Sequence, residues 1–482
     1  MQNITYDVRV YKTEVYKGTK VTTYTARWKT GNKPWKKPFR NSAQAESFRS
    51  DLVSAARKGE AFSLTTGLPI SWKRKESALT WYGFALAYMD AKWPYASPNH
   101  RRGIAEALTD ATEALLTAAP GTSGAPEREE IRQALRAWAF SARIRDGIDP
   151  PDHLRPVVQW LERNTIPLAD LTEDGRGPAL VRGILDRISK TKEGKPAAAN
   201  TANRKRMVVN NAMEYACEIR ALPGNPLKAV KWTKPKTLTT VDRRVVVNTE
   251  QARRLLNAVG EQGKRGERMV AFFGCMYYAA LRPEEVVDLR MEHLVSLPGE
   301  GWGEMLLTNA EPRSGTQWTD SGKARQRRQL KHRAHGETRP VPIHPELVVL
   351  LRRHLEEFGT APDGRVFVGP RGGGMTDRAY LKVFHAARKQ AFTPREAASP
   401  LASVPYALRH AAVSTWLNAG VPAPQVAEWA GHSVDVLLRV YAKCIDGQDA
   451  DAKRRILEAT TPPATTVPDA PKTSARIRHD QP

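Results

Sequence analysis

Residues 406–441 read YALRHAAVSTWLNAGVPAPQVAEWAGHSVDVLLRVY and hold most of the recognisable chemistry of this chain. Their apolar spacing predicts two helices, near 407–419 and 423–430. Arg409 lies in the first helix, the pair Gly431-His432 follows the second, and Tyr441 stands nine residues after the histidine. A metal-free phosphodiester transfer needs such groups, because cationic side chains neutralise the phosphate while a phenol oxygen attacks it.

A second arginine of the same kind lies in residues 280–289, ALRPEEVVDL, where Arg282 follows a helix predicted over about 268–279. Two guanidiniums can hold the non-bridging oxygens of a phosphodiester through planar, often bidentate contacts. Either arginine alone would more often form a structural ion pair. Their combination with a histidine and a tyrosine favours a phosphate site.

Together these boxes closely resemble the tyrosine recombinase (phage integrase) family. Residues 280–289 resemble its first arginine box, and residues 408–414, LRHAAVS, resemble its second. The Gly-His pair with a tyrosine nine residues later matches as well. The resemblance covers about 249–443 and implies a mainly α, mixed α+β catalytic domain.

The resemblance implies a role for each residue of the site. Tyr441 attacks the scissile phosphate and forms a 3′-phosphotyrosyl link, Arg282 and Arg409 bind the phosphate, and His432 hydrogen-bonds it. Glu285 is expected to brace the site and not to react. Because the phosphotyrosine conserves the bond energy, we expect no cofactor and no metal.

The family also uses a lysine in a β-hairpin as general acid to the leaving 5′ oxygen. Lys331 precedes the strand predicted at 338–343 in the expected way, and Lys323 is the runner-up because the intervening turn is longer than usual. Residues 323–339 hold seven Lys and Arg against one Glu. Plain phosphate contact is therefore the alternative role for these lysines.

Tyr406 departs from the resemblance, since the family usually has His or Lys three positions before the second arginine. A phenol can hydrogen-bond a phosphate, but it does not act as an imidazole does near neutral pH. Tyr406 is kept as a candidate catalytic residue whose role is open. His410 is expected to be a packing or supporting histidine, because on a helix it points about 100° away from Arg409.

The composition points to a nucleic-acid partner. The chain has 482 residues, enough for two to four domains, and 75 Lys+Arg against 51 Asp+Glu give a net charge of +24. We find no long apolar run for a membrane span and no signal peptide at the N-terminus. Three scattered cysteines suit a reducing compartment. The expected location is the bacterial cytoplasm, in association with the nucleoid, and no membrane partner is expected.

The charge is concentrated near the N-terminus, where residues 1–60 hold 13 Lys and Arg against 5 Asp and Glu. Alternating patterns predict strands over 6–11 and 21–28, a third short strand over 35–40, and a helix after them. A small basic sheet can enter a DNA groove, whereas the alternative is a solvated face over buried tryptophans. The candidate DNA contacts here are Arg27, Lys29, Lys36 and Lys37.

The next region predicts a bundle of helices, and Arg204, Lys205 and Arg206 open its last long helix as candidate phosphate contacts. The expected layout is an arm-type DNA-binding domain of three strands and a helix (1–62), a linker (63–75), an all-α, SAM-like core-binding domain (76–232), an interdomain linker (233–247), the catalytic domain (248–458) and a disordered tail (459–482).

Three functions remain open at this point. The first is a site-specific recombinase, specifically the integrase of a phage or integrative element. It would act as a homotetramer on double-stranded DNA attachment sites, with an excisionase-type directionality factor as a further partner. The second is a type IB topoisomerase, which shares the chemistry without strand exchange. The third is a non-catalytic DNA-binding protein with an integrase fold, which Tyr406 alone suggests. The ordered boxes and the basic N-terminal region favour the first.

Overall fold

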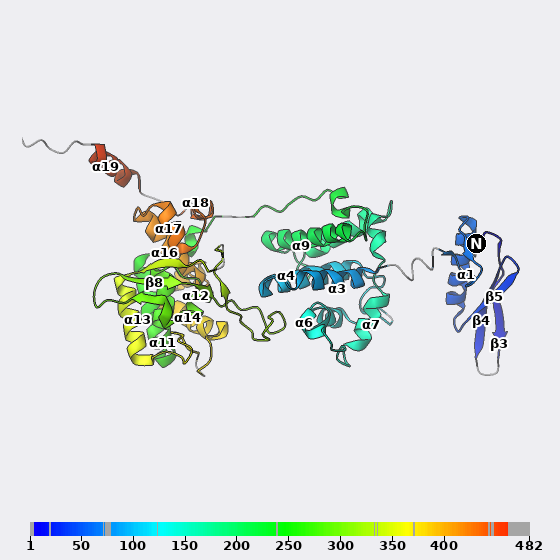
Figure 1. Cartoon of the computed structure of the whole chain (residues 1–482), viewed down its shortest axis with the longest axis horizontal. Helices are drawn as coiled ribbons and strands as arrows, with labels where there is room; N and C mark the ends of the chain where they lie inside the picture. The colour runs from blue at the N-terminus through cyan, green and yellow to red at the C-terminus, as the bar shows by residue number, and fades with distance from the viewer. Residues whose placement is uncertain are drawn as a thin grey trace, which may run out of the picture. The chain divides into compact units, whose positions relative to one another are not determined.

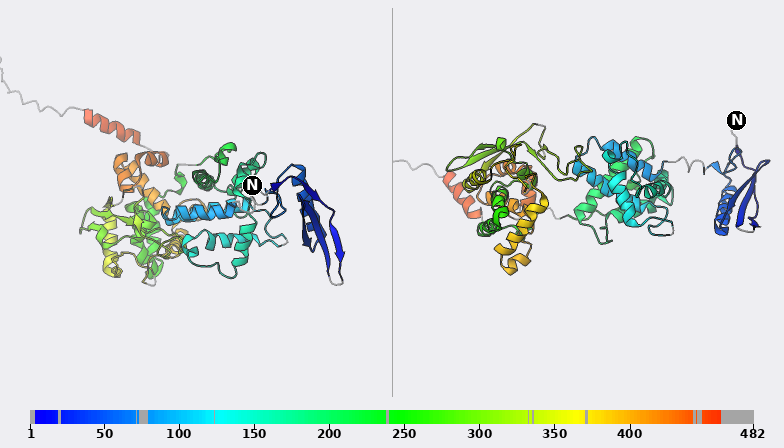
Figure 2. Two further views of the ribbon diagram at one scale, coloured as in Figure 1. Left: turned by 45° about the vertical axis from the view of Figure 1, so that its right-hand side comes forward. Right: turned by 90° about the horizontal axis from the view of Figure 1, so that it is seen from below.

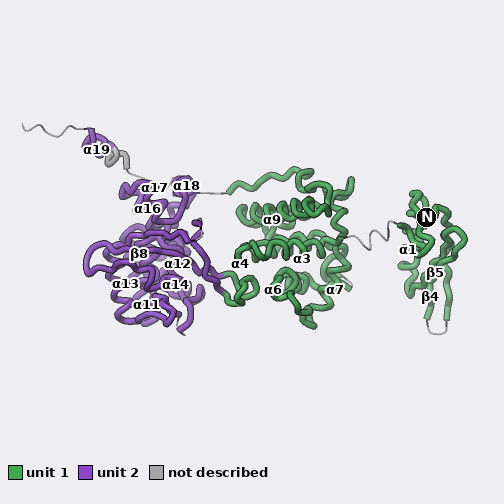
Figure 3. Tube along the Cα trace, viewed as in Figure 1, with its two compact units in different colours: residues 1–237, 314–324 green, residues 238–313, 325–482 purple. Residues whose placement is uncertain are grey.

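The computed structural model divides the chain into two compact units (Figure 3). The first consists of Met1–Thr237 and Ser314–Ala324, and the second of Leu238–Arg313 and Arg325–Pro482. A small β-sheet domain and a helical domain make up the first unit, and the second combines helices with short strands (Figure 1). The structure describes residues 4–460 except 19–20, 71, 73–78, 123, 238–239, 332, 335, 370–371, 442–443 and 445–447.

The N-terminal domain is an antiparallel sheet with one helix packed on it (Figure 2). Strand β4 is central, because β5 pairs with one of its edges while β2 and β3 pair with the other. Val10 opposes Trp28 and Glu14 opposes Thr25, so three residues between β2 and β3 face two residues of β4 and form a bulge. The elements are β1 (Ile4–Thr5), β2 (Val8–Val10), β3 (Glu14–Lys17), β4 (Thr22–Thr30), β5 (Lys33–Phe39), α1 (Ser42–Arg57) and β6 (Phe62–Ser63).

The predicted strands over 6–11, 21–28 and 35–40 are confirmed as β2, β4 and β5, within a few residues at their ends. The predicted helix is α1, and its start is fixed by Asn41, whose side chain accepts a hydrogen bond from the backbone of the first turn. Strand β3 was not predicted. All four of its residues are exposed, so it lacks the alternation that signals a strand.

The helical domain is built around α4, which packs against α3, α8 and α9. Ile104, Leu108 and Ala111, spaced three or four apart as the sequence pattern requires, are buried in its core. The elements are α3 (Trp81–Lys92), α4 (Pro98–Ala114), α5 (Arg128–Gln133), η1 (Ala134–Ala139), α6 (Ala142–Arg145), α7 (Arg155–Arg163), η2 (Leu168–Thr172), α8 (Gly177–Ile188), α9 (Ala199–Glu218) and η3 (Pro226–Ala229).

A short segment, Ser314–Ala324, packs in this first unit although it is distant in sequence from the helices. Trp318 is 2% exposed and belongs to the core of the helical domain. Arg101 donates to the Trp318 carbonyl at 2.9 Å and to a carboxylate oxygen of Asp320 at 2.7 Å, and its guanidinium lies 4.4 Å from the ring of Trp93. The sequence did not predict this packing, since a single tryptophan in a polar stretch has no periodicity.

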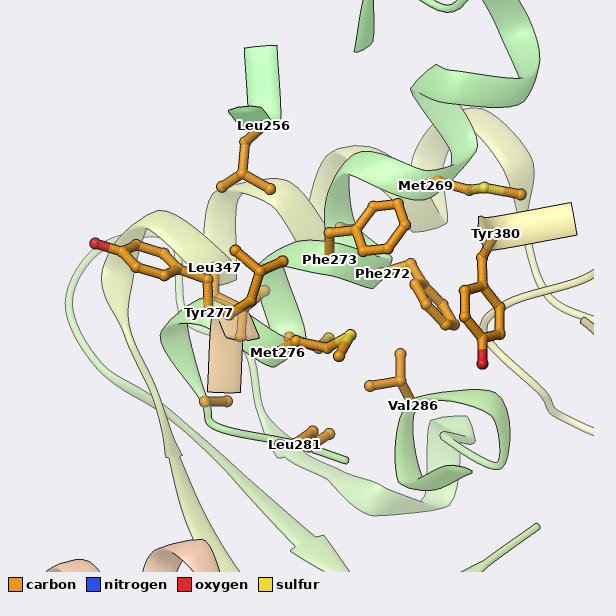
Figure 4. Close-up of a cluster of buried hydrophobic side chains, with 14 of the residues drawn as sticks. Leu256, Met269, Phe272, Phe273, Met276, Tyr277, Leu281, Val286, Leu347 and Tyr380 are labelled. Carbon is orange, nitrogen blue, oxygen red and sulfur yellow. The ribbon is translucent and has the colours of Figure 1, made fainter. Parts of the chain in front are cut away.

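The second unit is organised around α11, which packs against α10, α13 and α16. Phe272, Phe273 and Met276 of α11 meet Leu347 of α13 and Tyr380 of α14 in this core (Figure 4). The helices are α10 (Thr249–Gly260), α11 (Gly263–Tyr278), α12 (Pro283–Val287), α13 (Pro345–Phe358), α14 (Asp377–Ala391), α15 (Pro394–Ala398), α16 (Tyr406–Asn418), α17 (Ala423–Ala430), α18 (Val434–Tyr441) and α19 (Gln448–Thr460), with short turns at η4 (Arg243–Val245) and η5 (Met291–His293).

A three-stranded antiparallel sheet in the order β11-β8-β7 covers part of this unit. Its edge strand β11 contains Pro340 and Pro342, which an edge tolerates because their missing N–H groups face away from the ladder. The alternate residues Arg339, Val341 and Ile343 are buried. The strands of this unit are β7 (Leu294–Ser296), β8 (Gly303–Leu307), β9 (Asn309–Ala310), β10 (Arg328–Gln329) and β11 (Arg339–Ile343).

The strand predicted at 338–343 and the helices predicted near 407–419 and 423–430 are confirmed as β11, α16 and α17. Val241, in the expected interdomain linker, donates its N–H to the carbonyl of Val440 at 2.8 Å. Most of the predicted tail, from residue 461 onward, lies outside the described residues. Among the residues that the structure describes, no helix combines the length and apolar character that a bilayer crossing requires.

Candidate active site and DNA-binding surfaces

Four separate elements of the second unit bring the predicted site residues together. Arg282 caps the N-terminus of α12, and Arg409 lies in the first turn of α16. Helix α17 ends at Gly431, whose φ of 64° is the left-handed conformation that glycine adopts most easily, and this turn places His432. Tyr441 is the last residue of α18. The four residues are thus far apart in sequence but are positioned by helix ends.

Arg409 is fully buried and joins three parts of the site. Its guanidinium donates to the carbonyls of Ala280 and Ala430, and to Nε2 of His432 at 2.8 Å. Ala280 has a φ of 50°, a conformation that is costly for a residue with a side chain and that is found most often at functional sites. This strained turn lies immediately before Arg282, so Arg409 holds the segment that delivers the other arginine.

Arg282 is held by a carboxylate that also binds a third arginine. Glu285 accepts from Nη1 of Arg282 at 2.7 Å and from both terminal nitrogens of Arg339, at 2.8 and 2.7 Å. Arg282 also donates to the carbonyl of Gly431 at 2.7 Å. A Cβ at position 431 would lie 2.5 Å from Nη1 of Arg339, so glycine is needed for close packing as well as for its backbone angle. The expected bracing role of Glu285 is consistent with these contacts.

Sequence reasoning missed Arg339. Its signal was the alternation of β11, which places it on the same buried face as Val341 and Ile343. The partner of this buried arginine is a carboxylate, Glu285, which the nearby first arginine box supplies. Burial opposes ionisation of Glu285, but the charges of Arg339 and Arg282 outweigh it and hold the pKa of this carboxyl well below its usual range.

The centre of the site carries an excess of positive charge. Three guanidiniums, those of Arg282, Arg339 and Arg409, surround the single carboxylate of Glu285. In the described part of the chain, three of the buried nitrogen atoms that have no hydrogen-bond partner are Nε of Arg339, Nε of Arg409 and Nδ1 of His432. Buried donors without partners, together with excess positive charge, favour the binding of an anion at this site.

Tyr441 is buried, and its hydroxyl is 2.9 Å from Nδ1 of His410. The ring of His432 stacks on Tyr441 with centroids 6.1 Å apart, while Tyr406 packs edge-on against His410 at 5.0 Å. Sequence reasoning expected His410 to be only a packing or supporting residue. The structure places its ring in direct contact with the hydroxyl of Tyr441, the last residue of α18.

Burial and nearby positive charge set the ionisation of this group. Burial, reinforced by Arg409, lowers the pKa of His410 to about 4 and that of His432 to about 3. Burial raises the pKa of Tyr441 above its ordinary value, and Arg409 opposes that rise only in part. Both histidines are therefore neutral, and the tyrosine is a protonated phenol, near neutral pH.

The two candidate lysines lie in different units. Lys331 is exposed, follows β10, and belongs to the second unit with the arginines. Lys323 lies in the segment that packs in the first unit, and its carbonyl accepts a hydrogen bond from the Thr319 hydroxyl at 2.7 Å. Lys331 thus shares a compact unit with Arg282 and Arg409, and Lys323 does not.

Residues 246–446 match the model of the phage integrase family. They form a phage integrase domain. The chain is accordingly a site-specific DNA recombinase of the tyrosine type, as the sequence resemblance implied. No curated protein matches the sequence.

Solved recombinase structures are also similar to this recombinase, at low identity. The Tn1549 transposon integrase in complex with a circular intermediate DNA is 17% identical over 68% of this chain and 99% of its own, with a TM-score of 0.46. The XerH site-specific recombinase bound to its difH substrate is 12% identical over 76% of this chain and 97% of its own, with a TM-score of 0.41. The lambda integrase bound to DNA is 12% identical over 61% of this chain and 88% of its own, with a TM-score of 0.35. The family assignment rests on the match of residues 246–446 and not on these likenesses.

Outside the integrase domain, the N-terminal sheet separates the predicted DNA contacts by face. Arg27 opposes Lys36 in the ladder, and Arg9 opposes Lys29, so these four side chains share the face away from α1. Lys37 opposes Ala26 on the other face, where its ammonium lies 4.6 Å from the ring of Phe48. Arg9 was not among the predicted contacts, although the alternation of its strand could have revealed it.

The basic residues of α9 differ in their availability. Lys205 donates to Asp110 at 2.5 Å in a buried ion-pair network, and the guanidinium of Arg206 lies 5.0 Å from the ring of Trp232. Arg204 is exposed. A role in holding the helical domain together therefore accounts for Lys205, and Arg204 is the member of this trio best placed to contact a phosphate.

Replacing Glu285 by Gln should lower the free energy of unfolding of the integrase domain by about 3–5 kcal/mol near pH 7, because two buried guanidiniums lose their counter-charge. The pKa of Glu285 is lower in the folded state than in the unfolded state. Its stabilising effect is therefore present above the unfolded value of about 4.3 and is lost as the pH falls below it.

Denaturant unfolding of wild type and Glu285→Gln across this pH range measures the effect. The difference between them should narrow below about pH 4.5. Glu284→Gln, on the same short helix, is the matched control and should behave like wild type. An equal difference at pH 7 and at about pH 3.5 would contradict the assigned role of the buried carboxylate.

Proposed function

We propose that Tyr441 is the nucleophile with which this recombinase cuts and rejoins DNA through a 3′-phosphotyrosyl intermediate, and that the chain integrates or excises a phage or integrative element. The observation that carries the proposal is the convergence of Arg282, Arg409, His432 and Tyr441 around a buried, positively charged centre inside the phage integrase domain.

The unpaired donors of the site suggest how a phosphodiester would bind. Arg409 can only donate to His432, so Nε2 of this histidine is an acceptor and the proton of the neutral ring resides on Nδ1. Nδ1–H is buried and without a partner among the described residues, as is Nε–H of Arg409. A non-bridging phosphate oxygen would satisfy such donors and gain charge during attack, which is where fixed donors lower a barrier.

The remaining candidates complete the proposal. Lys331 is assigned as the general acid that protonates the leaving 5′ oxygen, because it belongs to the same unit as the arginines. Tyr406 lies half-buried with its ring 5.9 Å from the guanidinium of Arg409, so its hydroxyl is proposed to hydrogen-bond the phosphate. The chemistry needs neither a metal nor another cofactor, since the phosphotyrosine retains the energy of the broken bond.

Covalent trapping tests the nucleophile. A nicked duplex that loses its 5′ fragment on cleavage should convert wild-type protein to a DNA adduct stable to detergent, and Tyr441→Phe should give none while still binding the duplex. Wild type without an adduct would favour a non-catalytic DNA-binding protein, and adduct formation by Tyr441→Phe would disprove the assignment. Supercoil relaxation without exchange between paired attachment sites would favour a topoisomerase.

We further propose that the N-terminal sheet binds arm-type sites through its open face. Changing Arg27, Lys29 and Lys36 together to Ala should weaken binding to attachment-site DNA that includes its flanks, and should lower the salt dependence of log K by about three. Lys37→Ala, on the opposite face, is the matched control. Adduct formation on a short core duplex should be unchanged in both variants. An equal loss of DNA binding in the triple variant and in Lys37→Ala would contradict the proposal that DNA binds the face away from α1.

Recombination of two duplexes requires several active sites, and we propose a homotetramer on DNA joined through α19. Ile456 of this helix is 63% exposed, and the same unit contains an apolar cavity of about 800 Å³ lined by residues that include Tyr277, Trp302, Trp416 and Trp429. Helix α19 of a second copy is the proposed occupant. A directionality factor of the excisionase type and a location on the bacterial nucleoid belong to the same proposal.

Ile456→Asp should therefore abolish multi-subunit complexes on DNA, as measured by light scattering of protein with paired attachment sites. Covalent adduct formation at a single site should fall much less. Glu458→Ala, on another side of the same helix, should assemble like wild type. Normal assembly of Ile456→Asp would show that α19 does not join the subunits.

A further inference from the structure

The nucleophile proposed above carries a phenol proton that must leave when the oxygen attacks phosphorus. Burial raises the pKa of Tyr441, so the phenolate is not available in advance near neutral pH. A neighbouring group must therefore accept the proton during attack. Tyr406, the candidate one turn before His410 on α16, presents a phenol, which is a poor acceptor in this pH range.

Two histidines, His410 and His432, lie close enough to Tyr441 to be candidates for the proton acceptor. His432 stacks on the phenol ring, but its Nε2 lone pair already accepts a hydrogen bond from Arg409 at 2.8 Å, and its other nitrogen carries the proton. His410 approaches the hydroxyl itself, with Nδ1 2.9 Å from the phenol oxygen. A neutral imidazole with an unprotonated Nδ1 at this distance has the position of a general base.

We propose that His410 is a catalytic residue that accepts the proton of Tyr441 as the phenol oxygen attacks the scissile phosphate. The inference rests on the proposed role of Tyr441. In this step the bond between the phenol oxygen and phosphorus forms and the bond to the 5′ oxygen breaks. The phenol proton moves to Nδ1 of His410, and the leaving oxygen takes a proton from the general acid, assigned to Lys331.

The surroundings of His410 suggest why the base is weak until DNA is present. Burial and the neighbouring Arg409 disfavour the imidazolium form and lower the pKa of His410. A bound phosphodiester would add a negative charge next to Arg409 and Arg282 and so offset the positive field at the ring. The side of the imidazole next to Tyr406 is covered by that ring at 5.0 Å, which keeps it oriented.

Asparagine at position 410 separates proton transfer from positioning. Its side-chain oxygen can accept a hydrogen bond from Tyr441, but it does not take up a proton. His410→Asn should therefore slow adduct formation on the nicked duplex by about 10²- to 10⁴-fold while duplex binding is retained. A rate within about threefold of wild type would overturn the proposal. Unchanged thermal unfolding of the variant shows that the fold is intact, and His410→Ala supplemented with imidazole should regain part of the rate if folding of the Asn variant is impaired.

A duplex with sulfur in place of the bridging 5′ oxygen shows which end of the reaction His410 serves. A thiolate leaves without protonation, so this substrate should restore cleavage to Lys331→Ala but not to His410→Asn. Equal rescue of both variants would overturn the proposal, because His410 would then act on the leaving group. Absence of any adduct with wild type would overturn the proposed function and this inference together, whereas a normal wild type with an unaffected His410→Asn overturns the inference alone.

Discussion

The arginine cluster of the second unit depends on one buried carboxylate. Glu285 is 1% exposed and is shared by Arg282 and Arg339, which come from a helix end and an edge strand. Without it, two guanidiniums would remain charged in an interior of low dielectric constant, at a cost of several kcal/mol. With it, the cluster still holds more positive than negative charge once Arg409 is included. The protein thereby keeps a preformed cationic centre that is only partly neutralised by its own side chains.

The backbone is shaped to serve that centre. Ala280 and Gly431 both adopt left-handed conformations, at φ of 50° and 64°, and their turns bring carbonyl groups and side chains toward the arginines. Gly431 pays no conformational penalty, and its missing Cβ leaves room for Arg339. Ala280 is strained, and its carbonyl is held by Arg409. The contacts of the buried arginines therefore maintain the turns that position Arg282 and His432.

The sequence predicted the elements with strong periodicity and the residues in ordered motifs, and it failed where only tertiary contacts decide. Helices α16 and α17 and strand β11 followed from apolar spacing. The burial of Arg339 and the contact of His410 with the Tyr441 hydroxyl did not, because such contacts depend on partners from distant segments. Trp318 shows the same limit, since nothing local indicates that a polar stretch between two strands contributes a core residue to another unit. The alternation of the strand indicates that Lys36 and Lys37 point to opposite faces of the sheet. Only the strand register shows that Lys37 is on the face packed by α1.

The residues of the candidate site are attached to two different hydrophobic cores of the second unit. The segments of Arg282 and Arg339 are anchored in the large core around α11, whereas Tyr441 belongs to a smaller cluster with Leu417, Val426 and Leu437. Helix α16 contributes to both, with Leu408 in the large core and Val413 in the small one. A small cluster opens at lower free energy than a large core. Arg282 and Arg339 can therefore stay fixed while Tyr441 is repositioned. The contacts of Tyr441 with His410 and His432 are the ones that such a movement must break or carry along.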